Sequence, residues 1–459
     1  MQDLIYADQL RGWLSQGDFD SLRTFCISIH PENVAEALAQ LSSEQIWQAL
    51  SQLPLSDRAA VFTHLDEPLQ LELATTLRRD KLASLIVEMP PDERVDLLKG
   101  ISEDKREALL PAVAQAERED IRRLSAYSEG TAGAVMTSEY ATVSPSLTVA
   151  EAIAKLRQEA PDKETIYYAY VVDEARKLIG FVSLKDLILA RPEKKVKDIM
   201  HSEVISAQVT ESQEEAARKI QKYDFIALPV VNGNDALVGI ITYDDALDIL
   251  NEEFTEDMKK FMAITGEHEA GPYLRESAWK HFKHRSGWVL VLALLGMVSG
   301  FIVHRFEALL LQFSILATFM PMLVDAGGNT GSQSATLIVR ALALKEISSG
   351  DAFHILFKEL KVSLLLGALL AGVAFGRVFL FGTESGIPRG CSPTLIGAAV
   401  AAALAIQIIC STLIGAFLPL VAARLRADPA VVASPALTTI VDITGLLIFF
   451  TTVKIILGI

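Results

Sequence analysis

The ionisable residue with the most demanding surroundings is Asp442, which lies about midway along the apolar stretch of residues 430–459. A carboxylate at the centre of a bilayer costs several kcal/mol unless it faces water or a cation. On a helix, Asp442 shares one stripe of small or polar residues with Pro435, Thr438 and Gly445. This pattern predicts the wall of a cation pore. The alternative is a carboxyl that stays protonated or is hydrogen-bonded to a neighbouring helix.

A second set of carboxylates could bind a divalent cation outside the membrane. On one helix, Asp245, Asp248, Glu252 and Glu256 would share a face, and like charges four residues apart destabilise a helix by a few tenths of a kcal/mol per pair. A divalent cation would relieve this repulsion, whereas a solvated charged face is the simpler alternative. The full acidic run comprises Asp244, Asp245, Asp248, Glu252, Glu253, Glu256 and Asp257.

An internal repeat precedes the acidic run. Residues 135–156 resemble residues 199–220, and residues 167–188 resemble residues 225–247. Each copy ends in G-h-h-S/T-x-x-D, where h is apolar, and together these features resemble a tandem pair of cystathionine-β-synthase (CBS) domains. In that family the Ser/Thr and Asp can contact an adenosine ribose, which here implies Ser183 with Asp186, or Thr242 with Asp245. The same residue types also suit a simple helix N-cap.

Composition divides the chain into an acidic part and an apolar part. Hydrophobic residues make up 51% of the sequence and are concentrated after Arg285. From Ser286 onward there are 10 Lys/Arg and 8 Asp/Glu, a net charge of +2. Since the whole chain has a net charge of −15, residues 1–285 have a net charge of −17. A part this acidic attracts cations and not nucleic-acid phosphates. The three cysteines lack CxxC spacing, which argues against a zinc site.

Helical patterns dominate the remaining segments. Residues 1–130 read as short amphipathic helices in a loose repeat, typical of a helical superhelix. Asp92 and Asp96 there project from one helix face. We expect the CBS copies at 131–195 and 196–252, a connecting helix at 253–280 and a membrane domain at 281–459. The predicted fold is therefore multidomain: an all-α N-domain, an α+β CBS pair, a connecting helix and five transmembrane helices.

Hydropathy and basic loop residues predict the topology. The N-terminus lacks a basic segment followed by an apolar core, so we expect no secretory signal and cytoplasmic N-terminal domains. The C-terminus is then outside the cytoplasmic (inner) membrane. The second span runs into residues 321–342, where Pro321, Gly327, Gly328 and Gly331 are expected to loosen the helix so that carbonyls face a cavity. A glycine-rich packing seam is the competing interpretation. The predicted spans are 286–303, 306–324, 362–381, 393–423 and 430–457.

Two motifs in the membrane part carry a family resemblance. P-x-x-x-D-x-G-G-N-x-G-x-Q in residues 321–333 and D-P-A-V-V…T-T-x-x-D-x-T-G in residues 428–445 look like the membrane domain of the MgtE magnesium channels. The order of the segments matches as well, so the resemblance covers nearly the whole chain. It implies a homodimer in the lipid bilayer with a pore on the two-fold axis, where Asp442 of both subunits contributes to a Mg²⁺ site.

The resemblance also implies a sensor for cytosolic Mg²⁺. Ions bound between acidic surfaces would hold the domains together, and the connecting helices would then shut the pore. Ser212 occupies a position where the family can carry an acid, which puts the site on the second CBS copy in doubt. ATP binding at the CBS pair transfers less securely. By motif match the sensor residues are Asp92, Asp96, Glu214, Asp224, Asp245, Asp248, Glu253, Glu256 and Asp257.

The resulting interpretation is a CBS-gated Mg²⁺ channel without catalytic chemistry. Mg²⁺ dehydrates reluctantly and is usually held by one or two carboxylates, which suits a pair of Asp442 side chains. The sequence shows no P-loop and no nucleophile–base constellation, so it is not expected to be an enzyme. The alternatives are a channel for Mn²⁺, Co²⁺ or Ni²⁺, or a non-conducting, membrane-anchored nucleotide sensor. The residues expected to line the pore, besides Asp442, are Pro321, Gly327, Gly328, Asn329, Pro435, Thr438 and Gly445.

Overall fold

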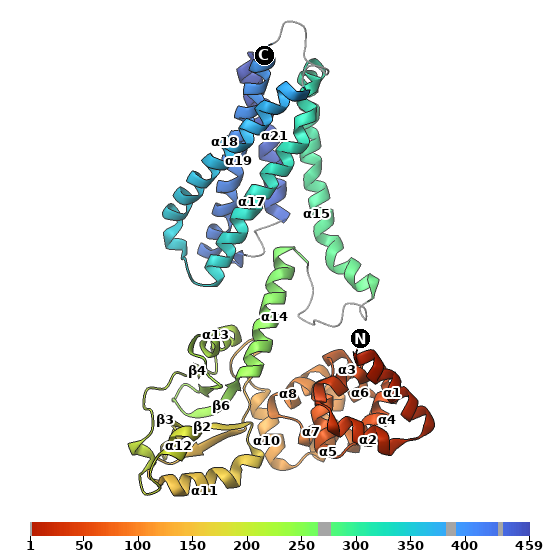
Figure 1. Cartoon of the computed structure of the whole chain (residues 1–459), viewed down its shortest axis with the longest axis vertical. Coiled ribbons are helices and arrows are strands. Elements are labelled where there is room, and N and C mark those ends of the chain that lie inside the picture. Colours follow the sequence, from red (N-terminus) through yellow and green to blue (C-terminus); the bar gives the residue numbers. More distant parts are fainter. Residues whose placement is uncertain (1, 265–276, 382–391, 430–434) are drawn as a thin grey trace. The chain divides into compact units, whose positions relative to one another are not determined.

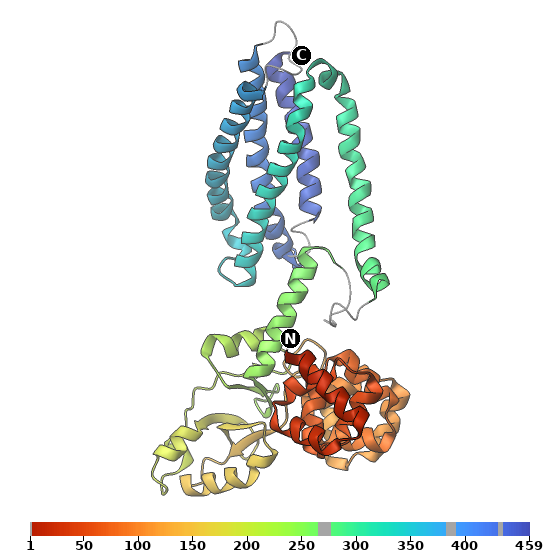
Figure 2. The same cartoon turned by 45° about the vertical axis from the view of Figure 1, so that its right-hand side comes forward.

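The computed structural model describes residues 2–264, 277–381, 392–429 and 435–459. These residues divide into two compact units, one up to Glu253 and the other from Phe254 onward. Figures 1 and 2 show the elements of each unit.

Short helices at the N-terminus stack in two rows. In one row α1 contacts α3, α3 contacts α5, α5 contacts α7 and α7 contacts α9; the other row runs in the same way from α2 to α10. This arrangement confirms the predicted all-α superhelix. The helices are α1 (Gln2–Gln16), α2 (Phe19–Ser28), α3 (Pro31–Leu38), α4 (Ser43–Leu50), α5 (Leu55–Thr63), α6 (Glu67–Thr76), α7 (Arg79–Glu88), α8 (Pro91–Gly100), α9 (Glu103–Leu109) and α10 (Gln115–Leu124).

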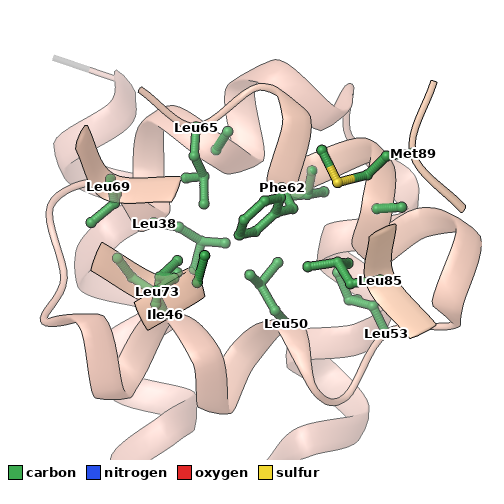
Figure 3. Packing of buried hydrophobic residues seen from close by; sticks show 14 of the residues in the cluster. Leu38, Ile46, Leu50, Leu53, Phe62, Leu65, Leu69, Leu73, Leu85 and Met89 are labelled. Atoms are coloured by element: carbon green, nitrogen blue, oxygen red, sulfur yellow. The ribbon is translucent and has the colours of Figure 1, made fainter. Parts of the chain in front are cut away.

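The core between the two rows is almost entirely aliphatic around one aromatic ring. Phe62 is fully buried and lies among Leu38, Leu50 and Leu85 (Figure 3). Local signals start the helices: proline occupies the first turn of α3, α6 and α8, where a missing N–H is tolerated. Each helix is too short to be stable alone in water, so packing of its apolar face against its neighbours holds it.

The repeated segments form two small sheets of the same topology. In each, two strands pair in parallel and the third pairs antiparallel to the second. This confirms the predicted CBS pair. The first copy contains β1 (Tyr140–Val143), α11 (Val149–Glu159), β2 (Thr165–Val172), β3 (Leu178–Ser183) and α12 (Leu184–Leu189), and the second β4 (Ala207–Gln208), α13 (Gln213–Tyr223), β5 (Ala227–Val231), β6 (Leu237–Thr242) and α14 (Tyr243–Phe261).

The glycine of each G-h-h-S/T-x-x-D motif admits a neighbouring segment against its strand. A Cβ on Gly180 would lie 2.8 Å from the carbonyl oxygen of His201, and one on Gly239 would lie 2.9 Å from that of Thr137. The next residue in each copy uses this closeness: the N–H groups of Phe181 and Ile240 donate to those same carbonyls at 3.0 Å. Any larger residue would push these segments off β3 and β6.

Helix α14 carries the acidic run as one continuous helix from Tyr243 to Phe261. The chain turns out of the helix at Ala263, whose φ of 52° is left-handed. The connecting helix predicted for residues 253–280 therefore reaches Phe261 as part of α14. Residues 265–276 of that prediction lie outside the described residues.

The second unit is built mainly from long helices. Helix α19 contacts α17, α18 and α21, and α15 contacts α21 on the side away from α18 (Figures 1 and 2). Among the described residues, four helices are long and apolar enough to cross a membrane: α15, α18, α19 and α21. The long helices are α15 (Ala278–Arg305), α17 (Met320–Ala343), α18 (Ala352–Phe381), α19 (Pro393–Arg424) and α21 (Pro435–Leu457).

The segment predicted as the second span, residues 306–324, is not one helix. It contains α16 (Glu307–Gln312), a 3₁₀ helix η4 (Ser314–Phe319) and the first turn of α17. Pro321 lies in that first turn, where its ring starts the helix instead of breaking it. Helix α17 has polar exposed residues, including Asp325 and Asn329, and is not among the four apolar helices. A fifth span remains a prediction.

Candidate functional site

Asp442 lies in the second turn of α21. It is half-buried and directly follows Val441, which is fully buried. Its Oδ1 atom is buried and, within the described part of the chain, has no hydrogen-bond partner. The sequence allowed either a pore wall or a carboxyl that is protonated or hydrogen-bonded to a neighbouring helix. A hydrogen bond to a neighbouring helix does not account for the missing partner of Oδ1 among the described residues. An oxygen that is desolvated and unpartnered is costly unless a cation or water faces it.

The glycines predicted to loosen the second span form a packing seam, so that expectation was wrong. Gly331 approaches Gly415 of α19 so closely that a Cβ on Gly415 would overlap its backbone. A Cβ on Gly327 would lie 2.7 Å from the amide nitrogen of Gln407. Glycine therefore serves close helix–helix contact inside a regular helix, as small residues do in membrane proteins.

The two sequence motifs meet where α17 packs against α21. A Cβ on Gly328 would lie 3.5 Å from the methyl carbon of Thr438, and Gly445 faces Gln407. Pro321 and Asn329 are exposed on α17, and Asn329 donates to Asp325 at 3.0 Å. Pro435 begins α21, but its side chain lies outside the described residues. The structure thus brings Gly327, Gly328, Thr438 and Gly445 together with the helix of Asp442.

A cluster of acids forms in the first unit around the N-terminal turn of α8. Burial, followed by the nearby charges of Asp245, Glu93 and Glu164, raises the pKa of Asp92 well above its ordinary value. The Oδ1 atom of Asp92 is buried and has no hydrogen-bond partner among the described residues. Burial, followed by Asp96, Asp245 and other acids, raises the pKa of Glu93 to about 7.

Two further elements complete this acidic cluster. Desolvation and then Asp245 raise the pKa of Glu164, which precedes β2, to about 7. On α14, burial raises the pKa of Asp245 although Thr242 donates a hydrogen bond to its carboxylate. We define the acidic cluster as Asp92, Glu93, Glu164, Asp244, Asp245 and Asp248, each of which acts electrostatically on another member or is acted on by one.

The cluster contains residues that the sequence reasoning missed. Glu93 lies three residues before Asp96, so its helical spacing could have indicated it. Glu164 follows a 3₁₀ turn and carries no local signal, because only the fold brings it near α14. Across the described residues, no group of three or more His, Cys, Asp and Glu side chains is arranged to hold a metal ion. The cluster is therefore a region of repulsion and not a formed coordination shell.

Several predicted sensor residues make other contacts. Glu214 accepts from Arg218 at 2.6 Å, and Glu253 accepts from Gln213 at 3.3 Å. Asp224 is exposed and caps α13 in a left-handed conformation with φ 53°. Asp96 is also exposed and pairs with Lys99 at 3.0 Å. Asp257 is exposed on α14.

The last turns of α14 contact the membrane helices of the second unit. Lys260 pairs with Glu256 at 2.5 Å and with Asp428, which follows α19, at 3.2 Å. Phe261 packs against the buried cluster of Ala335, Leu437 and Val441, and Val441 is one residue before Asp442. The end of the acidic helix is thus joined to the helix that carries the intramembrane acid.

The nucleotide candidates form a helix cap. Asp186 accepts hydrogen bonds from the Ser183 hydroxyl at 2.6 Å and from its N–H at 3.1 Å, so the two residues make the capping box of α12. Although burial opposes it, these bonds and His201 lower the pKa of Asp186. A cavity of about 110 Å³ lies nearby, lined by aromatic side chains that include Tyr168, Phe181 and Phe225.

Family models match three parts of the chain. Residues 29–130 match the MgtE intracellular N domain, residues 132–193 and 196–252 match CBS domains, and residues 320–452 match the MgtE divalent cation transporter domain.

Known relatives span almost the whole chain. It is 37% identical to the magnesium transporter MgtE of Thermus thermophilus over 98% of each chain. It is 34% identical to the magnesium transporter MgtE of Bacillus subtilis, over 95% of this chain and 94% of that one. Among solved structures, it resembles the cytosolic domain of the Mg²⁺ channel MgtE in complex with ATP, at 38% identity and a TM-score of 0.51, covering 53% of this chain and 99% of that one. The soluble part of a magnesium transporter matches at 30% identity and a TM-score of 0.52, covering 55% of this chain and 99% of that one.

Proposed function

The chain belongs to the MgtE family of divalent cation transporters, and we propose that it is a Mg²⁺-selective channel that imports Mg²⁺ down its electrochemical gradient. It is a membrane protein and, like its family, not an enzyme. The observation that carries the proposal is Asp442, the one acid of the mainly apolar helix α21, whose buried Oδ1 has no hydrogen-bond partner in the described part of the chain.

Two copies of Asp442 would form the ion site in a homodimer. One carboxylate binds a dication weakly, and the few long helices of one chain barely enclose a pore. A two-fold dimer would supply a second carboxylate and a second set of helices around the pore. Mg²⁺ keeps most of its waters, and a pair of carboxylates facing a hydrated ion suits it. Channels for Mn²⁺, Co²⁺ or Ni²⁺ remain the alternative within transport, because two carboxylates do not exclude those ions.

We propose that cytosolic Mg²⁺ shuts this channel through the acidic cluster. Ions can close a gate only by binding the closed state more tightly than the open one. Acids that repel one another when they are close provide this difference in Mg²⁺ affinity. A cation bound between them offsets the repulsion and so stabilises the state in which they are close. Helix α14 carries Asp245 and Asp248 near its start, and Lys260 and Phe261 at its end contact Asp428 and the helix of Asp442. This continuity supports α14 as the link between sensor and pore.

The proposed membrane location rests on hydropathy and on the basic residues of the loops. We propose that the protein spans the inner membrane several times, with its N-terminal domains in the cytoplasm and its C-terminus outside. The basic residues that would stay on the cytoplasmic side include Arg340, Lys358, Lys361 and Arg424.

The test of the proposed function is ion flux through the purified protein in liposomes, with Mg²⁺ varied on the side of the N-terminal domains. We expect Mg²⁺ entry that falls as Mg²⁺ on that side rises. The absence of any divalent flux would favour the second candidate, a non-conducting nucleotide sensor, which has no need of an acid at the position of Asp442.

The acidic cluster also predicts how stability depends on pH. In the folded state Glu93 and Glu164 hold protons up to a pH of about 7, whereas the unfolded chain loses them near their ordinary pKa of 4.5. Their contribution to stability is therefore complete at low pH and is lost as pH rises through about 7. Burial raises the pKa of Asp92 in the same direction. A shift of one pKa unit corresponds to about 1.4 kcal/mol. For a folded part of roughly 250 residues, this changes the unfolding temperature by about 3–6 °C. We expect the unfolding temperature of the full chain without divalent ions to fall by a few degrees between pH 6 and pH 8.

Mg²⁺ provides the control for this measurement. Because Glu93 and Glu164 are charged at pH 8, added Mg²⁺ should raise the unfolding temperature more at pH 8 than at pH 6. The Glu93→Gln variant should flatten the pH dependence. An unfolding temperature that is equal at both pH values without Mg²⁺ would mean that the acids do not repel one another in solution.

We propose ATP as a second ligand, at the CBS pair, because the matched cytosolic domain of the Mg²⁺ channel MgtE was solved with ATP. The aromatic cavity beside Phe181 supports a stacked base, but its volume of about 110 Å³ is below the 300 Å³ or more typical of ligand pockets. Calorimetry of the full chain should therefore show ATP binding only if this cavity opens. Asp186→Ala should weaken binding and Glu151→Ala, at the capping box of α11, should not. Absence of heat with both ATP and AMP would leave Ser183 and Asp186 as a helix cap.

A further inference from the structure

Gln407 is a buried amide in the middle of an apolar transmembrane helix. It lies in α19, a helix of 32 residues, and its side chain is 1% exposed. A polar amide in such a place is unfavourable unless it is hydrogen-bonded. Replacing such a group and its partner by apolar groups of the same shape is often nearly neutral. The amide therefore needs a reason beyond packing.

The amide reaches across to the helix that carries Asp442. Its Nε2 donates to the backbone carbonyl of Val441 at 3.0 Å. Val441 immediately precedes Asp442 and is itself fully buried. The hydrogen bond therefore restrains the turn of α21 that presents the acid, both along its axis and in rotation about it.

Two glycines make room for this amide. A Cβ on Gly327 of α17 would lie 2.7 Å from Nε2, and a Cβ on Gly445 of α21 would overlap the same nitrogen. Gly327 belongs to the G-G-N motif and Gly445 lies three residues after Asp442. The amide thus fills the space between the two helices of the candidate pore and fixes their separation.

The other end of the amide is not satisfied. Oε1 of Gln407 is buried and has no hydrogen-bond partner among the described residues. Here one end is held to Val441, and the unsatisfied acceptor remains as a cost of that placement.

We propose that Gln407 is a positioning residue for Asp442 that sets the ion affinity and ion preference of the pore. This inference rests on the proposed role of Asp442. A binding site must hold its ligating groups to within about 0.5 Å of the productive geometry. Mg²⁺ demands a near-ideal octahedral shell, so a displaced carboxylate should weaken Mg²⁺ more than the less demanding Mn²⁺.

The test compares Gln407→Met with Ser411→Ala in liposomes. Methionine keeps the length of the side chain and removes the donor to Val441. Ser411 lies one turn further along α19, is 1% exposed, and donates to the carbonyl of Gly327 on α17 rather than to α21. Both variants lose one buried hydrogen bond between helices, so the pair separates helix packing from positioning.

We expect Gln407→Met to raise the half-saturating Mg²⁺ concentration for flux by 3- to 10-fold and to lower the preference for Mg²⁺ over Mn²⁺. Ser411→Ala should leave both values within 2-fold of the parent. Equal half-saturation in the two variants would overturn the inference. If the parent itself conducts no divalent ion, the proposed function fails and not the positioning role alone.

A second variant at the same position tests the inference if Gln407→Met fails to assemble. Gln407→Asn keeps the amide but is one methylene too short to reach Val441, and it should show the same shift in half-saturation. If neither variant assembles while Ser411→Ala does, Gln407 is required for folding and the positioning role is overturned.

Discussion

Asp442→Ala is expected to reduce Mg²⁺ flux in liposomes by at least 100-fold while the protein still assembles. A hydrated dication that enters the apolar helix bundle meets an electrostatic barrier, and a pair of carboxylates lowers that barrier. A 100-fold loss corresponds to about 3 kcal/mol, at about 1.4 kcal/mol per factor of ten. The measurement is Mg²⁺ uptake at equal protein density, with assembly followed by size-exclusion chromatography.

The variant should fold because of what Asp442 lacks. Its Oδ1 has no hydrogen-bond partner among the described residues, so alanine breaks no bond at that atom and removes a buried polar group. Glu307→Ala is the matched control, since this acid is exposed on α16 and pairs with His304 at 3.1 Å. Uptake that is unchanged in Asp442→Ala would remove Asp442 from the pore. A loss in both variants would point to general damage.

The fold could be predicted wherever the sequence carried a local period. The loose repeat of short amphipathic helices predicted the superhelix, and the repeated G-h-h-S/T-x-x-D motif predicted two sheets of one topology. The second span could not be placed, because residues 306–319 are apolar but turn through α16 and η4. Hydropathy measures apolar content and not direction. Pro321 was misread for a related reason, since a proline that starts a helix and one that breaks it look alike in sequence.

The candidate site divides in the same way. Asp442 could be identified from the sequence, because an acid in an apolar stretch is energetically unfavourable in a membrane unless it serves a function. Gln407 carries the same signal in α19 and could have been found by the same reasoning, but its partner Val441 could not. The acidic cluster was predicted in part: helical spacing linked Asp245 with Asp248, whereas Glu164 joins them through tertiary structure alone.

Neutralising the acidic cluster should leave the channel conducting at Mg²⁺ concentrations that close the parent. The variant is Glu93→Gln, Asp245→Asn and Asp248→Asn, which keeps the shape of each side chain. Asparagine also keeps an oxygen that can accept the Thr242 hydrogen bond at the start of α14. Flux in liposomes, with Mg²⁺ titrated on the side of the N-terminal domains, measures the response.

The size of the effect follows from the free energy that a gate needs. Moving a two-state gate from 1% to 99% closed takes about 5.5 kcal/mol. One ion site at 100 times its Kd supplies about 2.7 kcal/mol, so at least two sites must act together. Loss of one site would return the gate to about half open, and loss of more would leave it open. We therefore expect the Mg²⁺ response to shift at least 10-fold.

The control for this variant removes the same charge elsewhere. Glu103→Gln, Asp104→Asn and Glu107→Gln change three exposed acids on α9, outside the acidic cluster, and should close like the parent. A cluster variant that is shut at every Mg²⁺ concentration would contradict ion bridging. It would mean that repulsion among Glu93, Asp245 and Asp248 keeps the pore open, and that relief of this repulsion closes it without any ion held between the domains.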